Sequence, residues 1–381
     1  MAHLNPRPRA ALILTGGGAR AAYQVGVLVA VAELLPDRRV NPFPILCGTS
    51  AGAINAASVA CLADNFGKAV EMVSAVWQNM HAGHIYRADA LGVGRSGLKW
   101  LGMLVAGWLV KNPPRSLLDN SPLRDLLNRH LDFRGIEHAI ASGALHALSI
   151  TASGYESGES IAFFQGHPSA EPWRRVQRLG IRCKITVNHL LASSAIPFVF
   201  PATHINREYF GDGSMRQLAP ISPAIHLGAE RILVVGAGRM NEMKERSRSE
   251  SHPSLAQIAG HALSSIFLDS LAVDIERLQR INNTVSALSP EVLEKAGVPL
   301  RPIRTLVIAP SQRLDLIAAH HADALPRPVK LLLRGIGAMN RRGGALTSYL
   351  LFEQPYTRAL IDLGYKDTME RAEEVRDFLE L

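Results

Sequence analysis

The chain has 381 residues, of which 47% are hydrophobic and 19% are charged, and its net charge is +8. This composition excludes a disordered protein and indicates a globular chain with a large core. The positive charge indicates either a cytoplasmic protein with a solvated basic surface or an anionic partner. Of the anionic partners, a membrane surface fits better than nucleic acid, because the chain has no nucleic-acid motif and no basic run interleaved with aromatic residues.

The first part of the chain repeats one pattern, a buried strand followed by a glycine turn and a helix. Residues 10–14 (AALIL) predict a strand that ends in a glycine loop, and residues 19–35 predict a helix that stops at Pro36. Residues 43–47 predict a second strand, and the alanine-rich residues 51–63 a buried helix. Two such units in succession are typical of a mainly parallel sheet covered by helices.

The remaining elements continue this architecture. We expect a mostly helical region at 65–140, strands at 144–152 and 160–165 joined by a turn at 154–158, further strands at 231–236 and 305–309, and a polar surface loop at 239–254. The predicted fold class is therefore α/β, a three-layer α/β/α arrangement with a mainly parallel central sheet. The sheet is expected to continue to about residue 312, and residues 313–381 to form a helical C-terminal extension.

The apolar segments and the cysteines indicate in which cellular compartment the protein resides. Three scattered cysteines without a C-x-x-C pair form neither a disulfide framework nor a zinc site and indicate a reducing compartment. Residues 10–14 are too short for a signal-peptide core. Residues 98–110 (LKWLGMLVAGWLV) are too short to span a bilayer, and predict either a buried helix or an interfacial helix or lid. We expect a cytoplasmic protein, or one at the periphery of a membrane.

Gly48-Thr49-Ser50-Ala51-Gly52 matches the G-x-S-x-G pattern of a nucleophile elbow. It directly follows a predicted strand and directly opens a predicted helix, as the elbow requires. Small residues are needed two positions on either side of the serine because backbone and helix crowd there, and Gly48 and Gly52 meet that need. The helix N-terminus would stabilise developing negative charge. The alternative is a serine that only caps an ordinary helix.

The loop Gly16-Gly17-Gly18 also lies between a strand and a helix, where free N–H groups can hold an anion. It could be an oxyanion hole, a dinucleotide loop of the G-x-G-x-x-G/A type, or a plain tight turn. The dinucleotide interpretation needs an acidic residue at the end of the second strand, where this chain has Gly48-Thr49-Ser50. We therefore favour the oxyanion hole. Arg20 could steady the loop, meet a phosphate or be an exposed helix residue.

A hydrolytic serine needs a base, and none of the 14 histidines lies in an obvious motif. Asp212 lies between Gly211 and Gly213, a short step after apolar Tyr209-Phe210. Partial burial at that turn would raise the pKa of its carboxyl and make it a better base. Taken alone, an ordinary turn aspartate is the simpler interpretation.

Together these motifs resemble the patatin-like phospholipase family. The resemblance covers about residues 10–225 and is carried, in order, by Gly16-Gly17-Gly18-x-Arg20, the elbow at Ser50, residues 192–197 (ASSAIP) with Phe200-Pro201, and Asp212-Gly213. The chain departs from the family pattern at Ala21, where a glycine is usual, and at Ser214, where glycine or alanine is usual. Both replacements are small, so the geometry should survive.

The resemblance implies a Ser–Asp dyad that works without histidine, in a catalytic domain at 10–225. Ser50 would attack an ester carbonyl, Asp212 would take its proton, and N–H groups around Gly16, Gly17 and Gly18 would hold the oxyanion. It implies a lipid acyl hydrolase without metal or other cofactor, acting on phospholipid or a related ester at an anionic membrane surface. Two alternatives remain: a catalytically inactive membrane-interaction protein with this fold, and a nucleotide-binding protein that uses the glycine loop.

Overall fold

A computed structural model describes residues 9–88, 116–238, 255–266, 270–295, 297, 300–335, 338 and 344–381. The predictions for residues 98–110 and 239–254 lie outside these residues. Within them, no helix is both long enough and apolar enough to cross a bilayer.

The strands form one mixed sheet. Their bounds are β1 (Ala10–Leu14), β2 (Ile45–Thr49), β3 (Ala147–Gly154), β4 (Ser160–Gly166), β5 (Trp173–Arg175), β6 (Arg178–Arg182), β7 (Thr203–Ile205), β8 (Glu208–Asp212), β9 (Arg231–Val235) and β10 (Arg304–Ile308). The order across the sheet is β10-β9-β1-β2-β3-β4-β6-β5, and β8 pairs with the end of β3 and with β7. The run from β10 to β3 is parallel, whereas β4 and β8 are antiparallel to β3.

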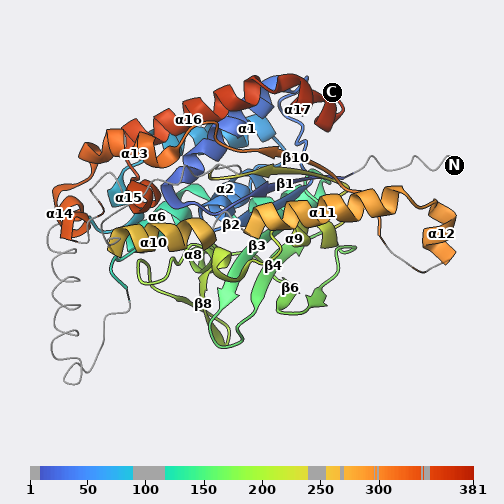
Figure 1. Ribbon diagram of the computed structural model, residues 1–381, viewed down its shortest axis with the longest axis horizontal. Coiled ribbons are helices and arrows are strands. Elements are labelled where there is room, and N and C mark those ends of the chain that lie inside the picture. The colour runs from blue at the N-terminus through green and yellow to red at the C-terminus, as the bar shows by residue number, and fades with distance from the viewer. Residues whose placement is uncertain are drawn as a thin grey trace, which may run out of the picture.

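Helices cover both faces of this sheet, as Figure 1 shows. In the first half of the chain they are η1 (Gly18–Ala21), α1 (Ala22–Leu34), α2 (Ala51–Ala60), α3 (Phe66–Gln78), α4 (Ala82–Ile85), α6 (Ser121–His130), α7 (Arg134–Ala141) and α8 (Val187–Ser193). In the second half they are η3 (Gly213–Arg216), α9 (Ser222–His226), α10 (Leu255–Ser264), α11 (Ser270–Ser286), α12 (Pro290–Lys295), α13 (Leu314–His321), η5 (Ala322–Ala324), α14 (Arg327–Gly335), α15 (Gly344–Leu350), α16 (Gln354–Met369) and α17 (Ala372–Leu379).

Alternation along the central strands builds two cores. In β1, Leu12 and Leu14 face a core shared with α1, α2, α3 and α16, while Ala11 and Ile13 face a second core shared with α9 and α11. All five residues of β1 are buried, as expected for a parallel strand covered on both sides. The three-layer α/β/α class predicted from the sequence is confirmed, with helices in the C-terminal region as expected.

The C-terminal helices pack directly on the first helix. α16 lies along α1 (Figure 1), and glycines let the two backbones approach: a side chain at Gly26 would overlap the Ile361 carbonyl, and one at Gly364 the Tyr23 carbonyl. Tyr23 also donates a hydrogen bond to Asp367 over 2.9 Å, which fixes the register of the pair. Residues 354–369 are therefore part of the core around β1.

Several predicted boundaries are shifted. The second strand was expected at 43–47 and is observed at Ile45–Thr49. It starts later because the Asn41 side chain accepts from the Phe43 N–H and donates to the Phe43 carbonyl, which withdraws Phe43 from the sheet ladder. Pro44 then has no N–H to offer. Strands β5, β6 and β7 were not predicted, because they are short and their residues are mostly polar or exposed.

Candidate active site

The site lies at the carboxyl ends of β1 and β2, where parallel strands lead into helices. Ser50 directly follows β2 and begins α2, and its backbone has φ 55° and ψ −129°. A positive φ is costly for a residue with a Cβ and persists only where the surroundings impose it. The elbow predicted from the sequence is thus present as a strained turn.

Three glycines make room for this elbow. A side chain at Gly52 would overlap the carbonyls of Leu14 and Thr15, and one at Gly48 the backbone of Gly52 and Ala53. A side chain at Gly213 would overlap the Thr151 carbonyl. The close approach of α2 to β1, and of the chain after Asp212 to β3, requires residues without a Cβ.

Sheet register brings Asp212 to Ser50. Thr49, the residue before Ser50, pairs with Thr151 of β3, and Asp212 pairs with the next residue, Ala152. Asp212 is the last residue of β8 and caps η3, with its Oδ1 accepting the Ser214 N–H over 2.9 Å. It was expected in a turn after the strand, and the pairing with β3 extends the strand to include it.

The Asp212 carboxyl is almost completely buried, with 1% of its surface exposed. Burial raises its pKa to about 6, while hydrogen bonds from the side chain of Ser50 and from Ser214 oppose that rise. Among the described residues, Asp212 Oδ2 is buried and accepts no hydrogen bond.

Ser193 supports the elbow from the other side, and its role was not predicted. Its Oγ accepts the Ser50 N–H over 2.8 Å and donates to the Thr151 carbonyl over 2.6 Å. One hydroxyl thereby ties the backbone of Ser50 to β3. Ser193 lies within the ASSAIP segment noted in the sequence, but only the fold shows which atom it holds.

The glycine loop lies beside the serine. Gly18 has φ 53°, and a side chain there would overlap the carbonyl of Tyr349. Within the part of the chain that the structure describes, the N–H groups of Gly16 and Gly17 donate to no acceptor. Unpaired N–H groups at this point are suited to hold a negative charge.

Arg20 is buried, with 5% of its surface exposed, so the interpretation as an exposed helix residue is wrong. Its Nε donates to Ser348 Oγ over 2.8 Å and its Nη1 to the Tyr349 hydroxyl over 3.1 Å. Its guanidinium carbon also lies 4.0 Å from the centre of the Tyr349 ring. Arg20 steadies the glycine loop by holding it to α15.

Polar side chains behind the two loops form a buried network. Gln24 donates to the Thr15 carbonyl over 2.7 Å, Asn55 donates to Gln24, and Trp77 donates to Asn55 over 2.8 Å. Each buried group has a partner, so the network fixes α1, α2 and α3 around the loops at little desolvation cost.

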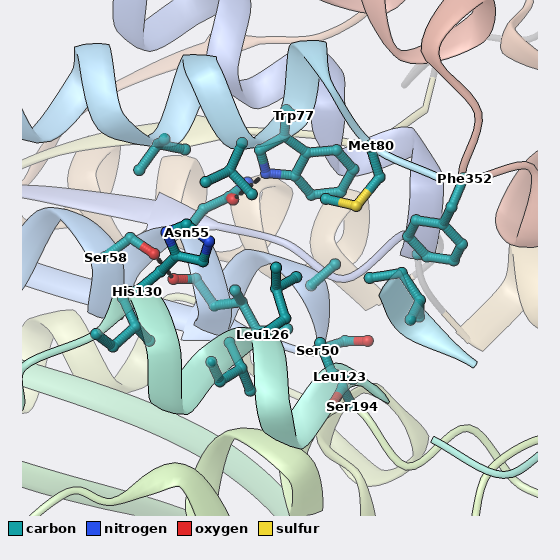
Figure 2. Close-up of a pocket in the computed structure, with 18 of the residues that line it drawn as sticks. Ser50, Asn55, Ser58, Trp77, Met80, Leu123, Leu126, His130, Ser194 and Phe352 are labelled. Carbon is teal, nitrogen blue, oxygen red and sulfur yellow. Dashed lines mark hydrogen bonds between the residues drawn. The ribbon is translucent and has the colours of Figure 1, made fainter. Parts of the chain in front are cut away.

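An apolar pocket opens on Ser50. Figure 2 shows Ser50 on one side of it and Ser58 and His130 on the other. Ser50, Ile54 and Ser58 follow at intervals of four residues and so lie along one face of α2 and its N-cap. At 1.5 Å per residue, the distance from Ser50 to Ser58 along the helix is about 12 Å. Most of its wall consists of aliphatic, methionine and aromatic side chains from α2, α3, α4, α6 and the loops: Ile54, Met72, Val73, Val76, Trp77, Met80, Ile85, Leu123, Leu126, Leu127, Leu131, Ile196, Phe200 and Phe352.

The described residues offer no cluster of three or more histidine, cysteine, aspartate or glutamate side chains that could hold a metal ion. The chemistry available to the site is that of a strained serine, a buried carboxyl with a raised pKa, unpaired N–H groups and an apolar pocket.

Comparison with known proteins gives a family. The search of curated proteins found no match. Among solved structures, the chain is similar to VipD from Legionella pneumophila, at 12% identity and a TM-score of 0.37, over 97% of this chain and 67% of VipD. It is also similar to the type III effector ExoU, at 17% identity and a TM-score of 0.30, over 98% of this chain and 89% of ExoU.

The sequence identities and TM-scores of these two structures are too low to assign a function to this chain. The family model described as patatin-like phospholipase matches residues 12–225, which is more than half of the chain and includes every predicted site residue from Gly16 to Gly213. The chain therefore belongs to the patatin-like phospholipase family.

Proposed function

We propose that this protein hydrolyses acyl esters of phospholipids or related lipids, with Ser50 as nucleophile and Asp212 as its base. The observation that carries the proposal is the apolar pocket that opens on a strained serine whose hydroxyl lies against a buried carboxyl. Apolar lining over about 12 Å of helix α2 is suited to an acyl chain.

The proposed reaction proceeds in two stages. Asp212 takes the proton of the Ser50 hydroxyl as its oxygen attacks the ester carbonyl, and the carbonyl oxygen becomes negative. N–H groups of Gly16, Gly17 and Gly18, with the N-terminal dipole of α2, stabilise that charge. Collapse of the tetrahedral species breaks the ester bond, and the departing alcohol takes the proton from Asp212.

The acyl group is then bound to Ser50. Asp212 takes a proton from a water molecule, whose oxygen attacks the acyl carbonyl, and Ser50 recovers its proton as the fatty acid leaves. A carboxyl with a pKa of about 6 suits both steps, because it is ionised near neutral pH and still basic enough to accept a proton.

We further propose that the substrate is presented at an anionic lipid surface. The chain carries a net charge of +8. Phe198 is 75% exposed and lies two residues from Phe200 of the pocket wall, so an apolar side chain is presented to solvent close to the site. Hydrolysis of phospholipid vesicles should be faster when the vesicles contain anionic lipid.

The test is labelling with a fluorophosphonate probe, together with hydrolysis of p-nitrophenyl butyrate. Wild type should be labelled at Ser50. Ser50→Ala should abolish labelling and lower the rate by about 10⁴-fold or more, since it removes the atom that forms the covalent bond. Ser142→Ala, at an exposed serine after α7, is the matched control and should behave as wild type.

Unlabelled wild-type protein, or full activity in Ser50→Ala, would overturn the proposal. An unlabelled protein that still binds vesicles would support the catalytically inactive alternative. Saturable binding of NADH would support the nucleotide-binding alternative, against which the apolar lining beside Gly18 argues.

A further inference from the structure

Residues Ser348–Glu353, here called the C-terminal strap, lie far outside the family match at 12–225 but contact both parts of the candidate site. The strap spans the end of α15 and the link to α16. Its two ends make different contacts, one with the glycine loop and the other with the pocket.

The first end holds the glycine loop. The Tyr349 carbonyl occupies the space where a side chain at Gly18 would lie, and Ser348 and Tyr349 accept the hydrogen bonds of buried Arg20. The conformation of the loop therefore depends on the strap as well as on its own glycines.

The second end forms part of the pocket wall. Phe352 is 5% exposed, stacks on Trp77 with ring centres 6.2 Å apart, and meets the edge of Tyr86 at 6.4 Å. The Tyr86 hydroxyl donates to the Leu350 carbonyl over 3.0 Å, which fixes the backbone before Phe352. Figure 2 shows Phe352 on the Ser50 side of the pocket, away from Ser58 and His130.

Glu353 anchors this wall. Its Oε1 accepts the Ala82 N–H over 3.1 Å, and its Oε2 lies 3.0 Å from His81 Nδ1. The side chain of Glu353 is only 10% exposed, whereas that of His81 is 52% exposed, so the contact with the Ala82 N–H is the one that is protected from water. They fix the residue after Phe352 to the start of α4, whose last residue, Ile85, also lines the pocket.

We propose that Phe352 is a specificity-determining residue for the acyl group and that Glu353 is the positioning residue that holds it. The proposal rests on the function proposed above. Because Phe352 lies on the Ser50 side, it limits the width of the acyl group near the ester carbonyl and leaves the space at Ser58 unaffected. The site thereby takes acyl groups that are linear next to the carbonyl and excludes branched ones.

The test compares kcat/KM for p-nitrophenyl butyrate and for the branched p-nitrophenyl pivalate. Phe352→Leu should raise the ratio of pivalate to butyrate by about tenfold, the size of effect that one or two methyl groups have in an apolar pocket. Phe378→Leu is the matched control, because Phe378 is a buried aromatic of α17 that does not line the pocket, and its ratio should equal that of wild type.

Glu353 is tested by rescue. Glu353→Ala loses the contacts with Ala82 and His81 and should raise the ratio in the same direction as Phe352→Leu. Glu353→Gln keeps an oxygen for the Ala82 N–H and should restore the wild-type ratio. A purely structural role would instead lower the rates on both esters equally and leave the ratio unchanged.

The outcomes separate this proposal from the proposed function. If wild type is active and Phe352→Leu has the same ratio of pivalate to butyrate hydrolysis, the role of Phe352 is overturned and the proposed function stands. If wild type neither hydrolyses esters nor takes the fluorophosphonate, the function fails, and titration with cis-parinaric acid tests the wall alone. A several-fold change in Kd in Phe352→Leu but not in Phe378→Leu supports the wall, and equal Kd values overturn it. Phe352→Met, whose flexible side chain adapts to the space that the ring leaves, replaces the leucine variant if circular dichroism shows that the leucine variant does not fold.

Discussion

The turns after β1 and β2 lie side by side, because the two strands are adjacent and parallel. Each places one residue at a positive φ, Gly18 at 53° and Ser50 at 55°. At Gly18 the backbone is unstrained for glycine, but the Tyr349 carbonyl leaves no room for a Cβ. At Ser50 there is room for a side chain, and the backbone is strained.

The unfavourable free energy is therefore concentrated on the serine side. Ser50 carries backbone strain, and Asp212 beside it carries a buried carboxyl. The glycine side instead depends on exact steric fit. Three substitutions test this difference, because removing strain or buried charge should stabilise the protein, whereas filling the glycine side should destabilise it.

The largest effect is expected at Gly18. Gly18→Ala adds a Cβ at φ 53°, which costs about 1–2 kcal/mol in backbone strain, and the overlap with the Tyr349 carbonyl adds about 1–3 kcal/mol. Urea unfolding should show a loss of about 2–5 kcal/mol, and fluorophosphonate labelling should slow because the loop is displaced. Gly143→Ala is the control, with φ 80° in open space, and should lose only the strain contribution. Equal losses in the two variants would show that steric fit does not distinguish Gly18.

The next effect is expected at Asp212 and depends on pH. The folded-state pKa of about 6 exceeds the ordinary value of 3.8, so the folded state favours the protonated carboxyl. The stability that the protonated Asp212 carboxyl contributes is therefore present below pH 4 and is lost as the pH rises through 6. The free energy of unfolding of Asp212→Asn should therefore exceed that of wild type by about 3 kcal/mol at pH 8, and the two values should be nearly equal near pH 4.

The same substitution should lower ester hydrolysis by about 10⁴-fold, the effect of losing the carboxylate in a serine hydrolase site. For wild type, kcat/KM should rise with pH through about 6 as Asp212 ionises. If the difference in unfolding free energy between Asp212→Asn and wild type were the same at pH 4 and pH 8, the fold would not raise the pKa of Asp212.

The smallest effect is expected at Ser50 itself. Ser50→Gly and Ser50→Ala both remove the hydroxyl, but only glycine relieves the strain at φ 55° and ψ −129°. Ser50→Gly should be more stable than Ser50→Ala by about 1 kcal/mol, since the relief of strain is partly offset by the entropy of the glycine chain. Equal unfolding free energies would remove the evidence for strain at the elbow.

Much of the fold could be predicted because its central strands β1 and β9 are buried along their whole length. Residues 10–14, 231–236 and 305–309 are mainly apolar, and the structure has β1, β9 and β10 there. The short strands β5 to β7 could not be predicted, because they pair at the edge of the sheet and carry no run of buried residues. The start of β2 was predicted two residues too early because the Asn41 side chain forms hydrogen bonds with the N–H and carbonyl of Phe43.

The candidate site divides in the same way. The sequence alone determined the serine elbow and the glycine loop, because each is a local motif of strand, small residues and helix. The approach of Asp212 to Ser50 depends on the pairing of β3 with both β2 and β8, which joins segments about 160 residues apart. The burial of Arg20 and the placement of Phe352 depend on α15 and the strap, more than 300 residues from the glycine loop. Only tertiary structure decided these, because partners so distant in the chain leave no local pattern from which their contact can be predicted.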